Sequence, residues 1–173
     1  MSLRPAVLTT SSRADGNTRA LAAVAFPTAS ADFFELNRMQ IGYYAYDGGN
    51  SGDDFLPLVE QIIDRDLWVL ATPIYWYTMS AQAKAFVDRL SDLLQSHKVL
   101  GRRLRGKKFA VVCSGSDPLP PPAFDEPLRL TCQYLGMEYC GSYYAQFDGR
   151  TLVGKTERTQ VLAFSHRIRE AHA

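Results

Sequence analysis

The feature that most constrains this chain is a regular alternation between short apolar runs and longer segments with helical spacing. The short runs are residues 6–10, 33–36, 67–71, 109–113 and 139–145. Apolar residues recur three or four positions apart in the segments near 18–26, 53–63, 79–93, 124–135 and 161–168. Strands that alternate with helices form a parallel sheet wrapped by those helices. We therefore predict an α/β fold: a doubly wound sheet of five parallel strands with helices on both faces.

Length and charge narrow the possible classes of protein. The chain has 173 residues and a formal net charge of +1, so we expect a single domain over residues 1–173 with one hydrophobic core. Nucleic acids and anionic membranes attract strongly basic surfaces, and the balanced charge argues against both as partners. No apolar run is long enough to span a bilayer, and the start lacks a signal-peptide pattern. We expect a cytoplasmic protein.

The three cysteines do not form a recognisable metal-binding or redox motif. Cys113, Cys132 and Cys140 are odd in number and show neither C-x-x-C spacing nor a zinc-finger histidine pair. We predict buried, unreactive thiols and no bound metal.

Ligands of doubly wound sheets bind outside the carboxyl ends of the strands, and the loop that follows the first strand there is suited to an anion. It supplies the hydroxyls of Ser11 and Thr18, the guanidinium of Arg13 and the amide of Asn17 just before a helix. A helix start points N–H donors and partial positive charge at a phosphate group. The loop matches neither the P-loop nor the dinucleotide pattern. Alternatively, it simply forms a turn, with Asn17 or Asp15 as helix cap.

Two further loops at the same edge favour a planar ligand. Loop 73–80 carries three consecutive aromatic residues, Tyr75, Trp76 and Tyr77, where a polar turn would be ordinary. Such rings favour a flat ligand that stacks on them, although neighbouring loops or a second subunit could also cover them. Loop 114–117 is small and polar, so it can let a planar ligand approach the backbone.

Two stretches of the chain resemble one known family. Residues 11–18, Ser-Ser-Arg-Ala-Asp-Gly-Asn-Thr, resemble the first-loop pattern of flavodoxin-like NAD(P)H-dependent FMN reductases, also called NAD(P)H:quinone oxidoreductase-like proteins. Residues 72–89 closely resemble that family's T-P-[IV]-Y-W…M-S…K-x-F-x-D-R segment. The similarity covers about residues 4–117. It implies a flavodoxin-like sheet with strand order 2-1-3-4-5.

The resemblance also implies roles for individual residues. The FMN phosphate would be held by Ser11, Arg13, Asn17 and Thr18. The isoalloxazine ring and ribityl chain would be lined by Pro73, Ile74, Tyr75, Trp76 and Tyr77, with Ser114, Gly115 and Ser116 on the other side of the ring. Asp88 and Arg89 match the motif too, but they lie two or three turns into the helix. A structural salt bridge or a subunit contact is the better interpretation of this pair.

One departure from some relatives is informative. Those relatives carry cysteines just before the second helix, whereas residues 41–54 here contain Tyr43, Tyr44 and Tyr46 and no cysteine. Without thiolates an iron–sulfur cluster cannot be ligated there. The tyrosines would wall the substrate cleft or cover the sheet edge.

The implied function is hydride transfer from NADPH or NADH through FMN to a quinone or similar small acceptor. The cofactor carries this chemistry, so no catalytic side chain is expected. The resemblance implies a homodimer or homotetramer, with the flavin site near a subunit boundary. Two alternatives are a non-enzymatic electron carrier of the flavodoxin type, which usually has an acidic docking face, and a flavin-free binding module that retains the fold. The basic stretch 102–108 could bind the 2′-phosphate of NADPH or be a solvated connector.

Overall fold

The computed structural model describes residues 4–13, 15–47, 50, 52–147, 149 and 153–170. The strands are β1 (Ala6–Thr9), β2 (Asp32–Glu35), β3 (Leu67–Tyr75), β4 (Thr78–Met79), β5 (Lys108–Gly115) and β6 (Glu138–Gln146). The helices are α1 (Asn17–Ala25), α2 (Phe55–Ile62), α3 (Ala81–Arg89), α4 (Asp92–Gln95), α5 (Lys98–Arg102), α6 (Glu126–Leu135) and α7 (Lys155–Glu170), with a short 3-10 helix η1 (Leu36–Arg38).

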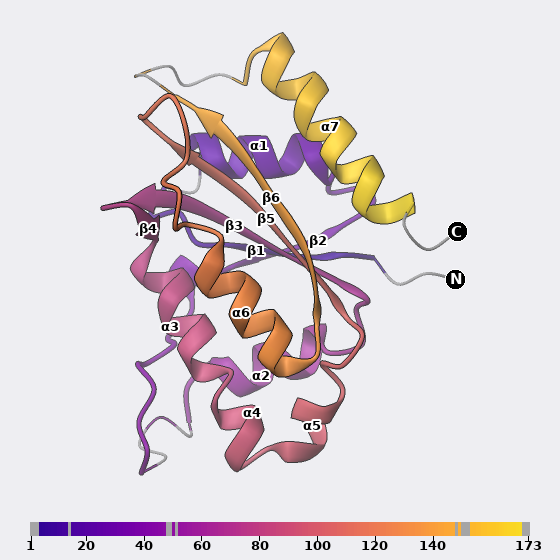
Figure 1. Cartoon of the computed structure of the whole chain (residues 1–173). Helices are drawn as coiled ribbons and strands as arrows, with labels where there is room; N and C mark the ends of the chain where they lie inside the picture. Colours follow the sequence, from indigo (N-terminus) through magenta and orange to yellow (C-terminus); the bar gives the residue numbers. More distant parts are fainter. Residues whose placement is uncertain are drawn as a thin grey trace.

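Five parallel strands form the sheet in the order β2-β1-β3-β5-β6. Counted without the two-residue β4, this is the order 2-1-3-4-5, and the predicted fold is confirmed. Helices α1 and α7 cover one face, and α2, α3 and α6 cover the other (Figure 1). None of the described helices is both long and apolar enough to cross a membrane.

The central strand β3 explains why its sequence is a continuous apolar run. Successive side chains of a strand point to opposite faces. Trp68 and Leu70 pack with the helices of one face, and Val69 and Ala71 pack with those of the other. A strand covered on both faces needs apolar residues at every position.

Two local details differ from the sequence-based expectation. The single helix predicted over 79–93 is split into α3 and α4, and buried Leu90 and Leu93 continue the apolar spacing across the break. Helix α5 was not expected, because it is short and contains Gly101. A Cβ at Gly101 would lie 2.2 Å from the carbonyl oxygen of Leu93, so glycine lets the two helices approach closely.

Candidate functional site

The three loops singled out in the sequence meet at the carboxyl edge of the sheet. The hydroxyl oxygens of Thr18 and Ser114 lie 2.6 Å apart in a buried hydrogen bond. Pro73 of β3 pairs in register with Ser114 of β5, so loops 73–80 and 114–117 leave the sheet side by side. The structure therefore brings together parts of the chain that are widely separated in sequence.

Loop 11–18 forms a tight turn in front of α1. The N–H of Arg13 donates to the hydroxyl of Ser11 at 3.2 Å, and the N–H of Gly16 donates to the carbonyl of Arg13 at 3.3 Å. A Cβ at Gly16 would lie 3.1 Å from the Ser11 hydroxyl, so the turn has little room for a side chain there.

The predicted cap of α1 is wrong. The N-cap residue is Gly16 rather than Asn17 or Asp15, and a glycine has no side chain that could cap the helix. The first N–H groups of an α-helix have no partner within the helix. The start of α1 therefore offers donors to an anion, with Arg13 exposed beside it, Ser11 and Asn17 half-buried, and Thr18 buried.

Hydrogen bonds that involve hydroxyl groups hold the two ends of loop 73–80. The N–H of Ser80 donates to the Thr72 hydroxyl at 3.0 Å, and the Ser80 hydroxyl lies 2.9 Å from that of Thr10. Ser80 also caps α3, because its hydroxyl accepts from the N–H of Ala83 at 3.3 Å. This buried network joins the ends of β1 and β3 to the start of α3. Thr10 and Thr72 are not among the site residues that the sequence predicts.

Loop 73–80 is largely a hairpin rather than an open loop. Tyr75 pairs with Thr78 in an antiparallel bridge, which leaves Trp76 and Tyr77 as a two-residue turn. Both have positive φ angles, 48° and 67°, a conformation that is costly for bulky residues and clusters at ligand sites. Trp76 is 90% exposed and Tyr77 68% exposed. The rings are therefore not covered by neighbouring loops.

A hollow of about 210 Å³ lies between this hairpin and loop 114–117. Its lining residues are Ile74, Trp76 and Tyr77 from the hairpin, Gly115, Ser116 and Asp117 from loop 114–117, and Leu119, Pro121 and Tyr144. Five predicted site residues thus surround one space. Pro73 is buried within β3 behind it, and Tyr75, although exposed, is not among the lining residues.

The last strand holds loop 114–117 in place, which the sequence did not reveal. The Tyr144 hydroxyl donates to the carbonyl of Asp117, and the Gln146 side-chain amide donates to the carbonyl of Ser116 at 3.0 Å. The N–H of Phe147 donates to the carbonyl of Gly115 at 2.8 Å. Burial raises the pKa of Tyr144, and Asp117 raises it further, so the hydroxyl remains a donor at neutral pH.

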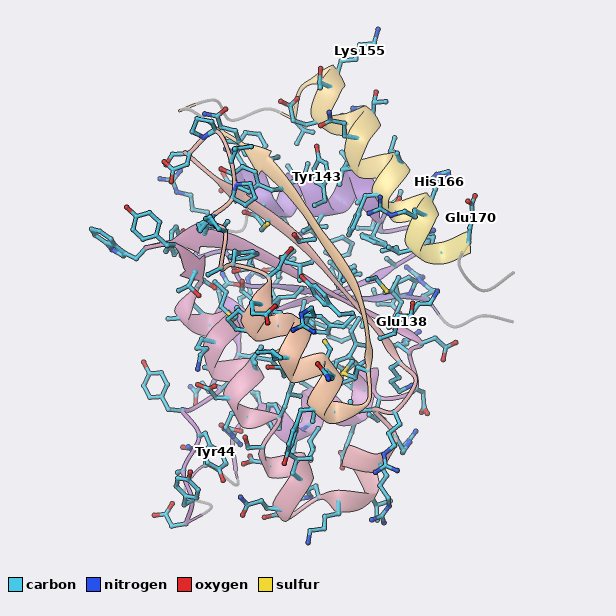
Figure 2. All side chains as sticks on the ribbon, viewed as in Figure 1. Tyr44, Glu138, Tyr143, Lys155, His166 and Glu170 are labelled. Carbon is cyan, nitrogen blue, oxygen red and sulfur yellow. The ribbon has the colours of Figure 1, made fainter. Side chains whose placement is uncertain are left out.

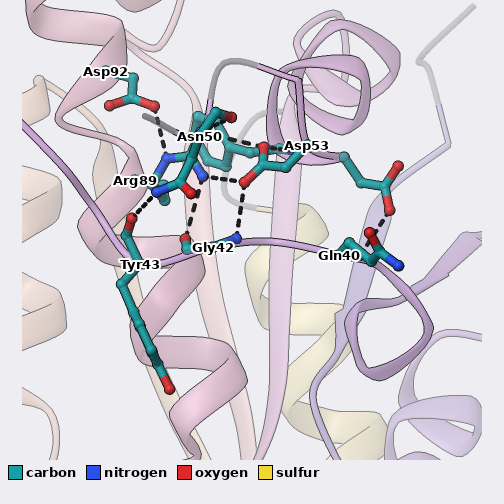
Figure 3. Close-up of polar contacts among 9 residues, drawn as sticks. Gln40, Gly42, Tyr43, Asn50, Asp53, Arg89 and Asp92 are labelled. Atoms are coloured by element: carbon teal, nitrogen blue, oxygen red, sulfur yellow. Dashed lines mark hydrogen bonds and ion pairs between the residues drawn. The ribbon is translucent and has the colours of Figure 1, made fainter. Parts of the chain in front are cut away.

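Arg89 belongs to a buried network of polar contacts (Figure 3). It is not among the residues that line the hollow. Its side chain is 4% exposed and forms ion pairs with Asp53 and, at 2.7 Å, with Asp92. It also donates to the carbonyl of Gly42 at 3.2 Å. Burial would raise the pKa of Asp53, but the Arg89 hydrogen bond and backbone N–H donors outweigh it, and the pKa is lowered. The structural salt bridge expected for Arg89 is confirmed.

Two of the tyrosines of residues 41–54, Tyr44 and Tyr46, lie beside α4. The rings of Tyr44 and Tyr46 meet edge to face with centroids 5.0 Å apart, and Gln95 of α4 donates to the Tyr44 hydroxyl at 3.1 Å. Figure 2 shows Tyr44 near this end of the molecule, away from the hairpin. Tyr44 is not among the residues that line the hollow. Tyr43 and Tyr46 are exposed.

The basic stretch 102–108 lies at the opposite end of the sheet. It leads into β5 at Lys108, and Ser114 is six residues further along this strand. At about 3.3 Å per residue the separation is roughly 20 Å. Arg103 instead pairs with Asp64, and Lys107 donates to the carbonyl of Arg65 at 3.1 Å. These contacts and this distance favour the interpretation of the stretch as a connector.

The cysteines are free thiols in or near the core. Cys113 and Cys132 are buried, whereas Cys140 is only half-buried. Burial raises the pKa of Cys132 to about 12, and it also raises that of Cys113. Thiolates, the reactive form, are therefore disfavoured at the two buried positions.

The fold and the geometry of its loops define a class: a flavodoxin-like α/β protein whose three candidate loops meet at the carboxyl ends of β1, β3 and β5. The model of the family described as "NADPH-dependent FMN reductase" matches residues 3–151, and the chain belongs to this family. It is thus an oxidoreductase of the NAD(P)H-dependent, FMN-using group.

Individual relatives agree with this family. YwqN of Bacillus subtilis, named as an NAD(P)H-dependent FMN-containing oxidoreductase, is 29% identical over 123 residues, covering 66% of this chain and 68% of YwqN. The Trp repressor binding protein from Bacillus subtilis has a TM-score of 0.75 and 22% identity over 98% of this chain and all of the other. General stress protein 14 from Treponema denticola, solved with FMN, has a TM-score of 0.62 and 16% identity over 95% and 94% of the chains. Both structures show a shared fold.

Proposed function

We propose that this chain binds FMN at the carboxyl edge of its sheet and passes a hydride from NAD(P)H to a quinone or similar small acceptor. The observation that carries the proposal is the hollow between the Trp76–Tyr77 turn and loop 114–117. A site for a flat ring needs aromatic surface on one side and accessible backbone on the other. The hairpin supplies the first, and Gly115 and Ser116 supply the second.

The phosphate end of FMN fits loop 11–18. The N-cap residue of the helix there is Gly16, and the macrodipole of α1 favours negative charge at that end. Arg13 is exposed next to it and would add a charge-assisted hydrogen bond. The Ser11 hydroxyl and the Asn17 amide flank the same turn.

The ring end of FMN fits the hollow. Gly115 lies directly against Tyr144, since a Cβ there would be 3.1 Å from the tyrosine hydroxyl and 3.5 Å from Cβ of Ile74. The missing side chain thus lets Tyr144 approach the backbone of loop 114–117. Backbone N–H groups in such a position stabilise negative charge that develops on a bound ring.

When bound, FMN would supply the hydride chemistry, and the protein would bind, orient and shield it. Among the described residues that line the hollow, Tyr144 has a pKa that burial raises, so its hydroxyl stays protonated and uncharged. Trp76 and Tyr77 line the hollow and remain largely exposed, so their rings can stack on a flat acceptor. This arrangement suits a quinone-like substrate.

The exposed aromatic turn also supports a homodimer or homotetramer. Trp76 and Tyr77 are large aromatics that remain exposed in one copy, and a second copy could cover them. Light scattering after size exclusion would give the assembly, and a monomer at all concentrations would contradict this part of the proposal. The cytoplasmic location belongs to the proposal as well.

Turnover with a quinone separates the enzyme from both alternatives. Purified protein loaded with FMN should oxidise NADPH or NADH faster when a quinone is added. An electron carrier would retain FMN but show no turnover with either nucleotide. A flavin-free binding module would be colourless after incubation with FMN and desalting.

A further inference from the structure

Tyr144 connects the last strand to the loop that bounds the hollow. It pairs in register with Cys113 of β5, one residue before that loop begins. Its ring is among the residues lining the hollow, and its hydroxyl donates to the carbonyl of Asp117. One side chain therefore both forms part of the wall and holds the loop opposite the hairpin.

The contact between Tyr144 and Gly115 leaves no spare space. A Cβ built on Gly115 would lie 3.1 Å from the Tyr144 hydroxyl and 3.3 Å from its ring carbon Cε2. Few real Cβ atoms approach other atoms this closely, so an alanine at Gly115 would push the ring. The position of Tyr144 and the absence of a side chain at residue 115 depend on each other.

The neighbouring Tyr143 provides a contrast within the same strand. Its hydroxyl lies 3.1 Å from Oε1 of Gln160 and donates to the carbonyl of Glu157 at 3.3 Å, both on α7. Figure 2 shows Tyr143 beside α7, on the face of the sheet opposite α6. Two adjacent tyrosines thus carry equivalent hydroxyl groups, and only one of them contacts the hollow.

We propose that Tyr144 is a positioning residue for the flavin ring. Its hydroxyl fixes loop 114–117 at the distance from the hairpin that a planar ring requires, and Gly115 is its necessary partner. The proposal rests on the proposed FMN site, and it adds a residue from the last strand to that site. It predicts that loss of one hydroxyl loosens the loop and weakens FMN binding.

The test compares Tyr144→Phe with Tyr143→Phe as a matched control. FMN binding is measured by quenching of flavin fluorescence, and amide hydrogen exchange is measured over loop 114–117 without FMN. We expect the Kd for FMN to rise about five- to tenfold in Tyr144→Phe, as for the loss of one hydrogen bond, and exchange in the loop to accelerate. Tyr143→Phe should change neither the Kd for FMN nor the exchange rate in the loop by more than about twofold. If the two variants had the same Kd for FMN and the same exchange rate in the loop, the proposal would be overturned.

Gly115→Ala gives a second, independent readout. Alone it should weaken FMN binding, because the new methyl group displaces the Tyr144 ring. Combined with Tyr144→Ala, which removes that ring, the same substitution should cost much less. If the effects of the two substitutions on the free energy of FMN binding were strictly additive, residues 115 and 144 would not be coupled.

The outcomes also separate this inference from the proposed function. If the native protein fails to bind FMN, the proposed function fails, and exchange in the FMN-free loop still tests whether Tyr144 holds it. If the native protein binds FMN and Tyr144→Phe binds it equally well with unchanged exchange, only the role of Tyr144 is overturned.

Discussion

Thr18 of α1 and Ser114 of β5 share a buried hydrogen bond of 2.6 Å, although they lie 96 positions apart in the sequence. Thr18 is in the first turn of the helix whose start suits a phosphate, and Ser114 begins the loop that bounds the ring hollow. The bond therefore sets the distance between the two halves of the proposed FMN site. Both hydroxyls are buried, so each satisfies the other.

Thr18→Val should reduce both stability and FMN affinity. The valine keeps the shape of threonine but leaves the Ser114 hydroxyl buried without its Thr18 partner, at a cost of about 1 kcal/mol. Urea unfolding and flavin fluorescence would measure the two effects. Thr159→Val is the control, because that exposed hydroxyl bonds only to the carbonyl of Lys155 in α7. If the two variants were equally stable, the bond would not contribute as described.

Replacing the aromatic turn should stabilise the protein and impair its site. Asn-Gly is the preferred pair for a two-residue hairpin turn with positive φ at both positions. The double variant Trp76→Asn with Tyr77→Gly should raise the unfolding free energy of the FMN-free protein by about 1 kcal/mol. FMN binding should weaken, because the rings are lost. A double variant less stable than the native protein would show that the rings stabilise the fold.

Arg89→Met should be strongly destabilising. The variant leaves the carboxylates of Asp53 and Asp92 without their buried cation, and breaking such a pair costs about 3 kcal/mol. Arg129→Met removes an exposed pair with Glu126 and should leave the urea midpoint nearly unchanged. Similar midpoints for the two variants would contradict a structural role for Arg89.

The same network should make stability sensitive to acid. The folded-state pKa of Asp53 is lowered, so its contribution is fully present above the unfolded carboxyl pKa of about 4. The contribution is lost as the pH falls from there through the lowered pKa. Asp53→Asn should therefore be less stable than the native protein at neutral pH, and the gap should close in acid. If the difference in stability between Asp53→Asn and the native protein stayed constant with pH, the titration of Asp53 would not contribute to stability.

The parallel sheet could be predicted because burial on both faces leaves a clear signal. The run Leu67 to Ala71 is apolar at every position, and the loops at the strand ends carry conspicuous polar or aromatic residues. The end of β3 was harder to place. Trp76 and Tyr77 form a turn that normally takes asparagine and glycine, so no propensity rule indicates a hairpin there.

The parts of the site contributed by the last strand could not be predicted either. Tyr144 looks like any half-buried strand residue, and its neighbour Tyr143 is chemically identical. Only the pairing of β6 with β5 shows which of them faces loop 114–117. Likewise, the cap of α1 was assigned to Asn17 or Asp15 by residue preference, whereas the tight turn at Ser11 and Arg13 puts Gly16 in that position.

The central claim is that FMN bound at this edge of the sheet accepts a hydride from NAD(P)H. The most direct measurement is anaerobic: the native protein is loaded with FMN, desalted, and mixed with NADPH or NADH while its visible flavin absorbance is followed. We predict that FMN stays with the protein and that its absorbance bleaches with at least one nucleotide, then returns when a quinone is added. Loss of FMN on desalting, or absorbance that stays unchanged with both nucleotides, would contradict it.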